Sequence, residues 1–323
     1  MLGYDLISRH RKELMGFATI WIAVLHATMW FSFPLLSAFK ATGNSGVDMF
    51  LFLSAFGLYF SYKYGDRYYI AFEKRRFRRI LPAYLLIGVL RCIYYGDSFS
   101  YALFRLSTLS YWLAEDKSVW FIACIIPLYL IAPLYLRYFN NDREEKMTIA
   151  AVFLGLVIGF IFRYYPQSGF ASRLSVFFLG FLAGKYADEK KQLTRRQAIL
   201  SFLCMAVSLG ILSYAYLCLD LDHLHMGWAL KWLPVLVFTM PLCLWLSALL
   251  EKCRTSKLLT SFGEVSLEFY MLFEMMIRVL DGILVIPQFL SYHNIAYNVI
   301  VMAITLALCR LLKILEGKLL NKK

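Results

Sequence analysis

The sequence predicts an all-α fold, a polytopic bundle of transmembrane helices, and three observations lead to it. Of the 323 residues, 60% are hydrophobic and 17% are charged, a balance too apolar for the surface of a water-soluble domain. The mean hydropathy is +0.61. Apolar windows long enough to cross about 30 Å of hydrocarbon, which takes about 20 helical residues, recur between short polar breaks. A lipid bilayer is therefore the expected partner of this chain.

We expect about ten membrane-spanning helices in one membrane domain that covers residues 1–323. No internal repeat, low-complexity tract or soluble appendage interrupts the series of apolar windows. Charged or turn-forming residues end each window, as Gly96 and Asp97 do after the third. In chain order the windows are 14–36, 46–64, 80–96, 118–137, 147–164, 170–187, 197–219, 229–250, 258–286 and 294–315.

Basic residues predict the orientation of the bundle. The formal net charge is +13, and most of the excess lies in breaks that would share one side with the N-terminus. Lys and Arg concentrate in cytoplasmic loops, so both termini are expected in the cytoplasm and the protein in the plasma (inner) membrane. No basic soluble module is present, so we expect no nucleic-acid partner. The basic residues of these breaks and the tail are Arg67, Lys74, Arg75, Arg76, Arg78, Arg79, Arg143, Lys146, Lys190, Lys191, Arg195, Arg196, Lys252, Arg254, Lys257, Lys318, Lys322 and Lys323.

The cysteines and histidines give no metal-site signature. The seven cysteines are scattered, mostly in apolar stretches, without a CxxC pair. His223 and His225 lie beside Asp220 and Asp222 in a break on the opposite side, but loop residues at this spacing form a weak metal signal. Solvation or contact with a sugar is the favoured role of that group, and we expect no metal.

His26 is the first candidate for chemistry. In a helix that starts near Leu14 it lies about 18 Å along the axis, near the middle of a bilayer. Ionisable residues at that depth are costly and usually functional, and histidine is the side chain best suited to general base catalysis near neutral pH. A structural alternative is a hydrogen bond from a neutral imidazole to a backbone carbonyl of a neighbouring helix.

Asp48 is the second candidate. It enters an aromatic-rich helix, where its carboxylate could orient His26. It lies near the predicted helix start, so helix capping or a place in the headgroup layer are open alternatives.

Five cations in six residues form the densest charged group: Lys74, Arg75, Arg76, Arg78 and Arg79. We expect them in a loop that leads into a helix through Pro82. A positive-inside anchor would explain part of this cluster. Its density also fits a site for several phosphates, which arginine binds in bidentate geometry.

Six segments, in a fixed order, carry a family resemblance. They are Gly16–His26, Gly46–Ser54, Arg75–Pro82, Val119–Phe121 with Tyr129 and Pro133, Phe178–Gly180, and Phe262–Tyr270. In this order they resemble the integral membrane acyltransferases of acyltransferase family 3, over nearly the whole chain.

The resemblance implies transfer of an acyl group, usually acetyl, from cytoplasmic acetyl-CoA or another acyl-CoA to a hydroxyl of an extracytoplasmic sugar or glycan. His26 would act as the general base and the cationic cluster would bind the phosphates of CoA. The motif residues Trp120, Glu268 and Tyr270 are predicted to contact substrate.

Two positions depart from the family pattern. Members often carry an arginine eleven residues before the histidine, where this chain has Met15, and a second histidine where it has Phe273. A mechanism that needs two histidines is therefore doubtful here. Helical geometry puts Lys12 about 40° and Arg11 about 60° from the missing arginine's face, so Lys12 is the predicted substitute and joins the expected CoA site.

Other polar and aromatic residues have more ordinary expected roles. Glu274 and Arg278 can form an i,i+4 ion pair. Arg91 and Arg163 are expected to extend to the membrane interface. The tryptophans near the outer side could stack on sugars, although interfacial anchoring is the commoner role; they are Trp112, Trp120, Trp228 and Trp232.

Two alternatives to an active acyltransferase stay open. A transporter or glycan exporter would also combine helices, intramembrane charges and outer aromatics, but the chain has no paired halves with interrupted helices. A catalytically degenerate family member would explain Met15 and Phe273. The sequence names neither the acceptor, the acyl group nor an oligomeric state.

Overall fold

The structure, a computed structural model, confirms the all-α class. It describes residues 2–65, 69–139, 143–165, 167–221, 224, 227–253, 256–283 and 294–320, with side chains at the ends of the last two segments described to 281 and 315. Helices α1 to α16 and a 3-10 turn account for most of these residues, and the β structure in this part of the chain is one isolated bridge between Gly3 and Gln192.

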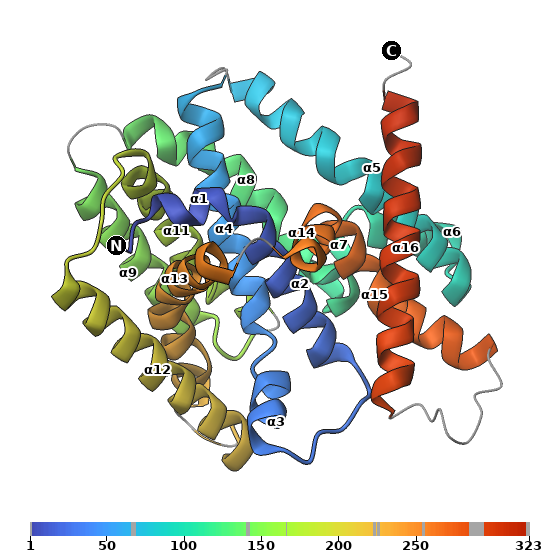
Figure 1. Ribbon diagram of the computed structural model, residues 1–323. Coiled ribbons are helices and arrows are strands. Elements are labelled where there is room, and N and C mark those ends of the chain that lie inside the picture. Colours follow the sequence, from blue (N-terminus) through green and yellow to red (C-terminus); the bar gives the residue numbers. More distant parts are fainter. Residues whose placement is uncertain are drawn as a thin grey trace.

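The helices follow the predicted windows in most places (Figure 1). Their bounds are α1 Asp5–Arg9, α2 Arg11–His26, α3 Pro34–Ala41, α4 Ser45–Lys63, α5 Tyr69–Tyr95, α6 Phe99–Leu106, α7 Leu109–Ala114, η1 Lys117–Val119, α8 Trp120–Tyr138, α9 Glu144–Ile161, α10 Ser168–Ala171, α11 Leu174–Asp188, α12 Arg195–Cys218, α13 Gly227–Cys253, α14 Lys257–Glu264, α15 Ser266–Ile283 and α16 Ile295–Leu320.

Four described helices are long and apolar enough to cross a membrane: Lys117–Tyr138, Arg195–Cys218, Gly227–Cys253 and Ile295–Leu315. In α12 only 17% of the most apolar window is buried inside the protein, and in α16 only 28%. Such long apolar surfaces need a lipid environment. The chain is thus a multi-pass membrane protein, while the number of about ten spans and the cytoplasmic termini stay predictions.

Two predicted windows are interrupted well inside their length, so each contains two helices and not one continuous helix. The window 14–36 contains α2, which ends at His26, and α3, which begins at Pro34. Proline lacks the backbone N–H that a continuing helix needs and is tolerated in the first turn. The window 258–286 is interrupted at Val265, between α14 and α15.

The cationic cluster lies in a helix and not in the predicted loop. Residues 74–79 are all in α5, which begins at Tyr69 and continues through Pro82. Lysine and arginine are good helix formers, and tertiary packing outweighs the hydrogen bond that an internal proline removes. A helix fixes which cations share a face, and this determines the site described below.

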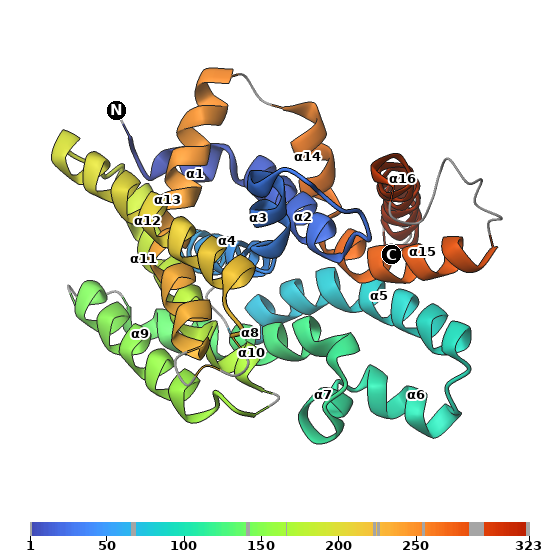
Figure 2. The same cartoon turned by 90° about the horizontal axis from the view of Figure 1, so that it is seen from below.

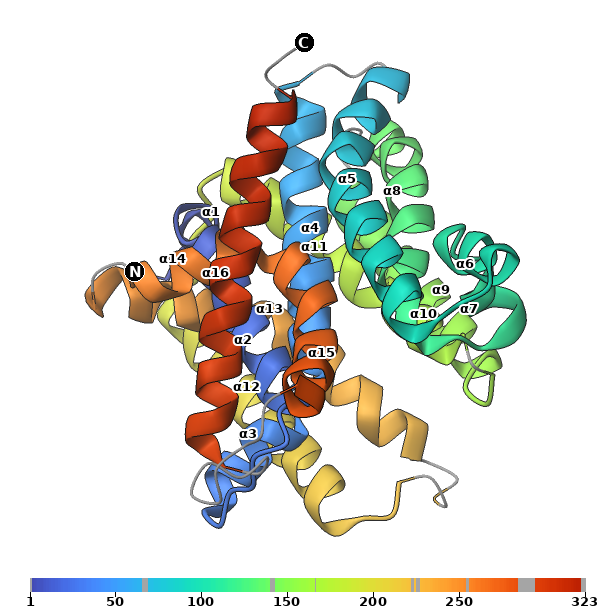
Figure 3. The same ribbon diagram turned by 90° about the vertical axis from the view of Figure 1, so that its right-hand side faces the viewer.

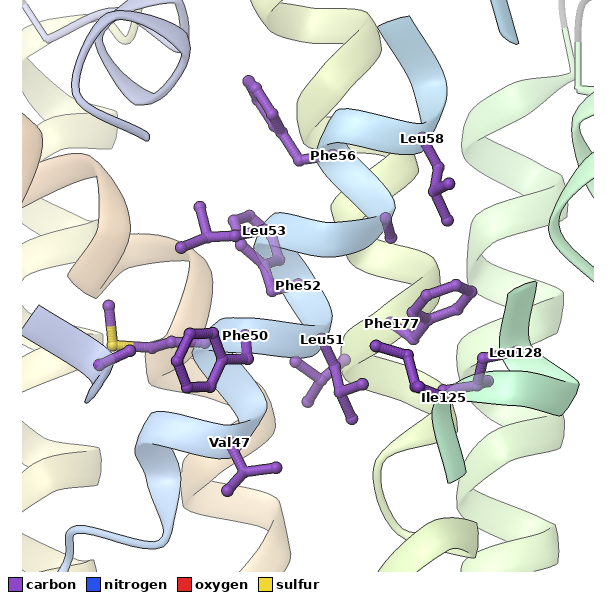
Figure 4. Packing of buried hydrophobic residues seen from close by; sticks show 14 of the residues in the cluster. Val47, Phe50, Leu51, Phe52, Leu53, Phe56, Leu58, Ile125, Leu128 and Phe177 are labelled. Atoms are coloured by element: carbon purple, nitrogen blue, oxygen red, sulfur yellow. The ribbon is translucent and has the colours of Figure 1, made fainter. Parts of the chain in front are cut away.

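Helix α4 forms the centre of the bundle. Figure 2 shows it near the middle of the molecule, and it contacts α2, α8, α11 and α13. Phe52, Phe56 and most other α4 side chains are buried. Figure 4 shows the close packing of α4 side chains against Ile125 and Phe177 of the neighbouring helices. This closely packed helix carries Asp48 in its first turn.

Two glycines allow α2 and α14 to touch backbone to backbone. A Cβ atom at Gly16 would lie 1.8 Å from the carbonyl oxygen of Leu259, and one at Gly263 would lie 1.9 Å from that of Lys12. No other residue fits at these positions. The contact holds the start of α2 beside the junction of α14 and α15. Figure 3 shows α16 and α5 upright, and α15 contacts both of them.

Candidate active site

A cavity of about 1050 Å³, here called the chamber, lies between α2, α5, α8, α13 and α15. His26, the last residue of α2, lines it, and its side chain is exposed to the open space. The helix stops at His26 because the chain turns extended at Ala27. The imidazole therefore reaches a space large enough for a sugar ring, as a general base must.

A second, smaller cavity of about 70 Å³, here called the basic cavity, contains three guanidinium groups. Arg11 of α2 and Arg76 and Arg79 of α5 line it together with apolar residues and Tyr129. No carboxylate is among the described residues that line it. Arginines that share a cavity wall with no carboxylate form a strong site for phosphate.

A third cavity of about 460 Å³, here called the vestibule, opens beside α1 and the start of α2. It shares Arg11, Met15, Arg79 and Ser266 with the basic cavity. The basic cavity in turn shares Phe121 and Tyr270 with the chamber. The three cavities thus follow one another in series through the bundle.

Phe121 and Tyr270 form the partition between the chamber and the basic cavity. Their ring centroids are 4.8 Å apart, and Phe121 is buried. Phe50 supports Phe121 from the other side at 6.3 Å. Two aromatic side chains therefore separate His26 from the three arginines of the basic cavity.

Only part of the predicted cationic cluster faces the cavities. Arg76 and Arg79 are three residues apart, which puts them on one face of α5. Lys74, Arg75 and Arg78 are exposed and line none of the three cavities. Sequence alone could not divide the cluster because it predicted a loop.

Arg11, and not the predicted Lys12, joins these arginines. Its guanidinium lies against Gly57, where a Cβ atom would be 2.3 Å from Nη2, and its Nε donates to the carbonyl oxygen of Leu53 at 3.1 Å. The absence of a side chain at Gly57 leaves room for Arg11 to extend along α4. Lys12 lines the vestibule, exposed and paired with Glu264 at 3.0 Å.

Arg11 and Arg76 stay charged although both are partly buried. Burial, followed by the charge of Arg79, lowers the pKa of Arg11 to about 10. Burial also lowers the pKa of Arg76, with smaller contributions from neighbouring charges. An anion in this cavity would relieve the repulsion between the guanidinium groups.

Asp48 pairs with Arg173, a residue that the sequence analysis missed. Nε of Arg173 lies 3.5 Å from Oδ1 of Asp48, and both side chains are 2% exposed. The Arg173 guanidinium lies between the rings of Trp120 and Trp232, at 4.9 and 4.5 Å. Among the described residues no hydrogen bond joins Asp48 to His26. The available signal was a lone arginine in an apolar window, which needs a buried counter-charge.

The carboxylate whose charge reaches His26 is Glu274 of α15. It lines the chamber and accepts a hydrogen bond from Nη2 of Arg278 at 3.1 Å, which confirms the predicted i,i+4 pair. Phe273, where the family often has a second histidine, also lines the chamber.

The three predicted substrate contacts differ in position. Trp120 and Tyr270 line the chamber, and Tyr270 also lines the basic cavity. Glu268 is buried, lines none of the three cavities and interacts electrostatically with Cys309 of α16.

The described residues contain no group of three potential metal ligands. His223 and His225 lie outside the described residues, so the weak metal signal of that segment stays a sequence observation.

Comparison with known proteins agrees with the resemblance noted above. The sequence matches the family profile described as an acyltransferase domain over residues 14–313. Comparisons with curated proteins and with solved structures gave no significant match. The matched range contains His26, Met15, Arg76, Arg79 and Tyr270, and it spans nearly the whole chain. The chain therefore belongs to the acyltransferase 3 family of membrane acyltransferases.

Proposed function

We propose that this protein transfers a short acyl group, acetyl in the simplest case, from acyl-CoA to a hydroxyl of a sugar or surface polysaccharide. The observation that carries the proposal is the series of three cavities. It joins an anion-binding cluster of arginines at one end to an accessible imidazole at the other.

The donor enters from the vestibule. Its phosphates bind Arg11, Arg76 and Arg79, whose charges no lining carboxylate of the basic cavity offsets. The narrow basic cavity suits the slender pantetheine arm, which extends toward Phe121 and Tyr270. Opening of this aromatic pair brings the thioester carbonyl into the chamber. By the positive-inside rule the vestibule faces the cytoplasm, where acyl-CoA is made.

The acceptor enters the chamber from the extracytoplasmic side. His26 removes the proton from the acceptor hydroxyl as its oxygen attacks the thioester carbonyl. A C–O bond forms, the tetrahedral intermediate collapses, and the C–S bond breaks. The leaving thiolate takes the proton from the imidazolium, which gives the ester and free CoA. One histidine suffices for both proton transfers, so Phe273 does not exclude this reaction.

Asp48 and Glu274 have separate proposed tasks. Glu274 stabilises the imidazolium that forms on His26. Asp48 neutralises Arg173 and so fixes Trp120 and Trp232 in the chamber wall, a positioning role. We expect no direct contact between Glu268 and the acceptor, since Glu268 lines none of the cavities.

The test uses the full chain purified in lipid nanodiscs. Acyl-CoA binding is measured by calorimetry, and thioester cleavage by the free thiol released when a sugar acceptor is present. We expect wild-type protein to bind and cleave acetyl-CoA. His26→Ala should lower the rate about 10²–10⁴-fold, the usual contribution of a general base, with donor binding retained. Full activity of His26→Ala would contradict the assignment of the base.

A transporter is the second candidate, because cavities in series also describe a translocation path. The same nanodisc preparation decides between them. Absence of acyl-CoA binding, together with uptake of a labelled sugar into vesicles that contain the protein, would support transport. Donor binding without turnover would instead support a degenerate family member.

A further inference from the structure

The chamber has an excess of positive charge that the proposed reaction does not use. Some of its ionic groups are paired: Arg173 with Asp48, Arg278 with Glu274, and Asp116 at 3.0 Å with Arg105, which Asp97 shares. Those that remain on its wall are Arg91, Lys117 and Arg163 against Glu115. Three cations thus face Glu115 and the one negative charge left by Asp97 and Asp116 around Arg105, so a positive excess remains. Among the described residues no ion pair joins Arg91, Lys117, Arg163 or Glu115 to a partner.

Arg163 lies over two aromatic rings and donates to a backbone carbonyl. Its guanidinium stacks on Phe160 at 4.0 Å and Tyr164 at 4.4 Å, and Nη1 donates to the carbonyl oxygen of Phe160 at 2.7 Å. Stacking orders the flat guanidinium and leaves its remaining N–H groups available to an anion.

Arg91 is similarly ordered and has an unsatisfied donor. It lies over Tyr95 at 5.6 Å, and Nη1 makes a long contact of 3.4 Å with the carbonyl oxygen of Ser118, next to Lys117. Its Nε is buried without a hydrogen-bond partner. A buried donor without a partner is costly, so a ligand oxygen at this place is favoured.

We infer that the acceptor carries an anionic group, a carboxylate or a phosphate, which Arg91 and Arg163 bind in the chamber. The inference rests on the proposed function and narrows its acceptor class. The two guanidinium groups recognise the anion, while Trp120, Tyr164 and Tyr165 of the same wall contact the sugar ring. A uronic acid in a polysaccharide and the phosphate of a phosphorylated or lipid-linked sugar share this chemistry.

The experiment compares three probes of similar size: glucose, glucuronate and glucose 1-phosphate. Their binding is measured by tryptophan fluorescence on the full chain in nanodiscs of zwitterionic lipid, so the readout does not depend on turnover. We expect at least one charged probe to bind about tenfold more tightly than glucose, as charge-assisted hydrogen bonds require, and the tighter one identifies the source.

Arg163→Gln and Arg91→Gln should each remove most of this preference and leave glucose binding unchanged. Arg163→Lys keeps the charge but loses the planar fork, so an intermediate preference is expected. Arg196→Gln, on the exposed start of α12, is the matched control. Thermal unfolding midpoints establish that each variant is folded.

Equal binding of charged and neutral probes, or an equal effect of the Gln variants on all of them, would overturn the inference. If the headgroups of anionic-lipid nanodiscs abolish the preference of the wild-type protein by competition, these arginines are assigned to lipid and the inference is overturned too. If the wild-type protein does not bind acyl-CoA, the proposed function is contradicted instead. The two failures can be told apart because the donor site does not include Arg91 or Arg163.

Discussion

The chamber and the basic cavity are built in contrasting ways. The chamber is about 1050 Å³ and has charges of both signs and several aromatic rings, while the basic cavity is about 70 Å³ and lined by arginines and apolar groups. A narrow site of one charge sign suits one slender anion, whereas a wide site of mixed character can hold varied sugars. The donor is therefore expected to be recognised more strictly than the acceptor.

The largest effect is expected from a change of one arginine in the basic cavity. Arg79→Ala should raise the KM for acyl-CoA at least tenfold, because a charge-assisted contact to phosphate is lost, and the effect should shrink as salt rises. The measurement is initial rate against donor concentration at two ionic strengths.

Arg78→Ala is the matched control for this variant. Arg78 is the adjacent residue of α5, is exposed and lines none of the cavities. It should change the KM less than twofold. Equal effects of the two variants would show that the cluster acts as a diffuse charge and that the division between its faces has no functional meaning.

A second, smaller effect on the reaction rate is expected from a change in the chamber. Glu274→Gln removes the carboxylate whose charge reaches His26, so the rate should fall roughly three- to tenfold with the donor KM unchanged. Arg278→Gln serves as control, because it breaks the same ion pair and leaves the carboxylate in place. A rate unaffected by Glu274→Gln would leave His26 without an electrostatic partner in the chamber.

The partition between the two cavities offers a third test. Phe121→Leu shortens one of the two side chains that separate them, so longer acyl groups should pass more easily. We expect kcat/KM for butyryl-CoA, relative to acetyl-CoA, to rise about threefold. Leucine is chosen over alanine because truncation of a buried phenylalanine to alanine costs about 3–5 kcal/mol of stability. An unchanged ratio would mean that the acyl group does not pass this pair.

The fold class and much of the candidate site could be predicted from the sequence, and the reasons are physical. Apolar windows and family motifs indicated the helices, His26 and the cationic cluster. The break after His26 was missed since residues 27–36 are apolar whether helical or not. The choice of Lys12 over Arg11 came from helical angles alone, which ignore the space that Gly57 leaves for a long side chain.

Pairings between distant segments were beyond the sequence. Asp48 and Arg173 are 125 positions apart, and only the packing of α4 against α11 brings them together. The separation of the cluster into Arg76 and Arg79 on one side and Arg75 and Arg78 on the other needed the helix to be known first. In both cases the charged residues could be recognised in the sequence, but which residues they contact depended on the tertiary structure.

The smallest expected effect concerns Glu73, the carboxylate within the segment that carries the cluster. Burial raises its pKa to about 7, and the charge of Arg76 offsets this only in part. Glu73 lines none of the three cavities, and both of its carboxylate oxygens are buried without a hydrogen-bond partner. Glu73 is therefore outside the wall of the basic cavity, although its charge acts on Arg76.

A raised carboxyl pKa stabilises the fold at low pH, and that stability is lost as pH rises through about 7. Glu73→Gln keeps the neutral form at every pH. We expect it to raise the unfolding temperature by a few degrees at pH 8, with little change at pH 5, and to leave the KM for acyl-CoA unchanged at both. Thermal unfolding and initial rates measure the two quantities. A lower donor KM in Glu73→Gln would mean that this carboxylate does compete with phosphate for the arginines, and the basic cavity would then share the mixed character of the chamber.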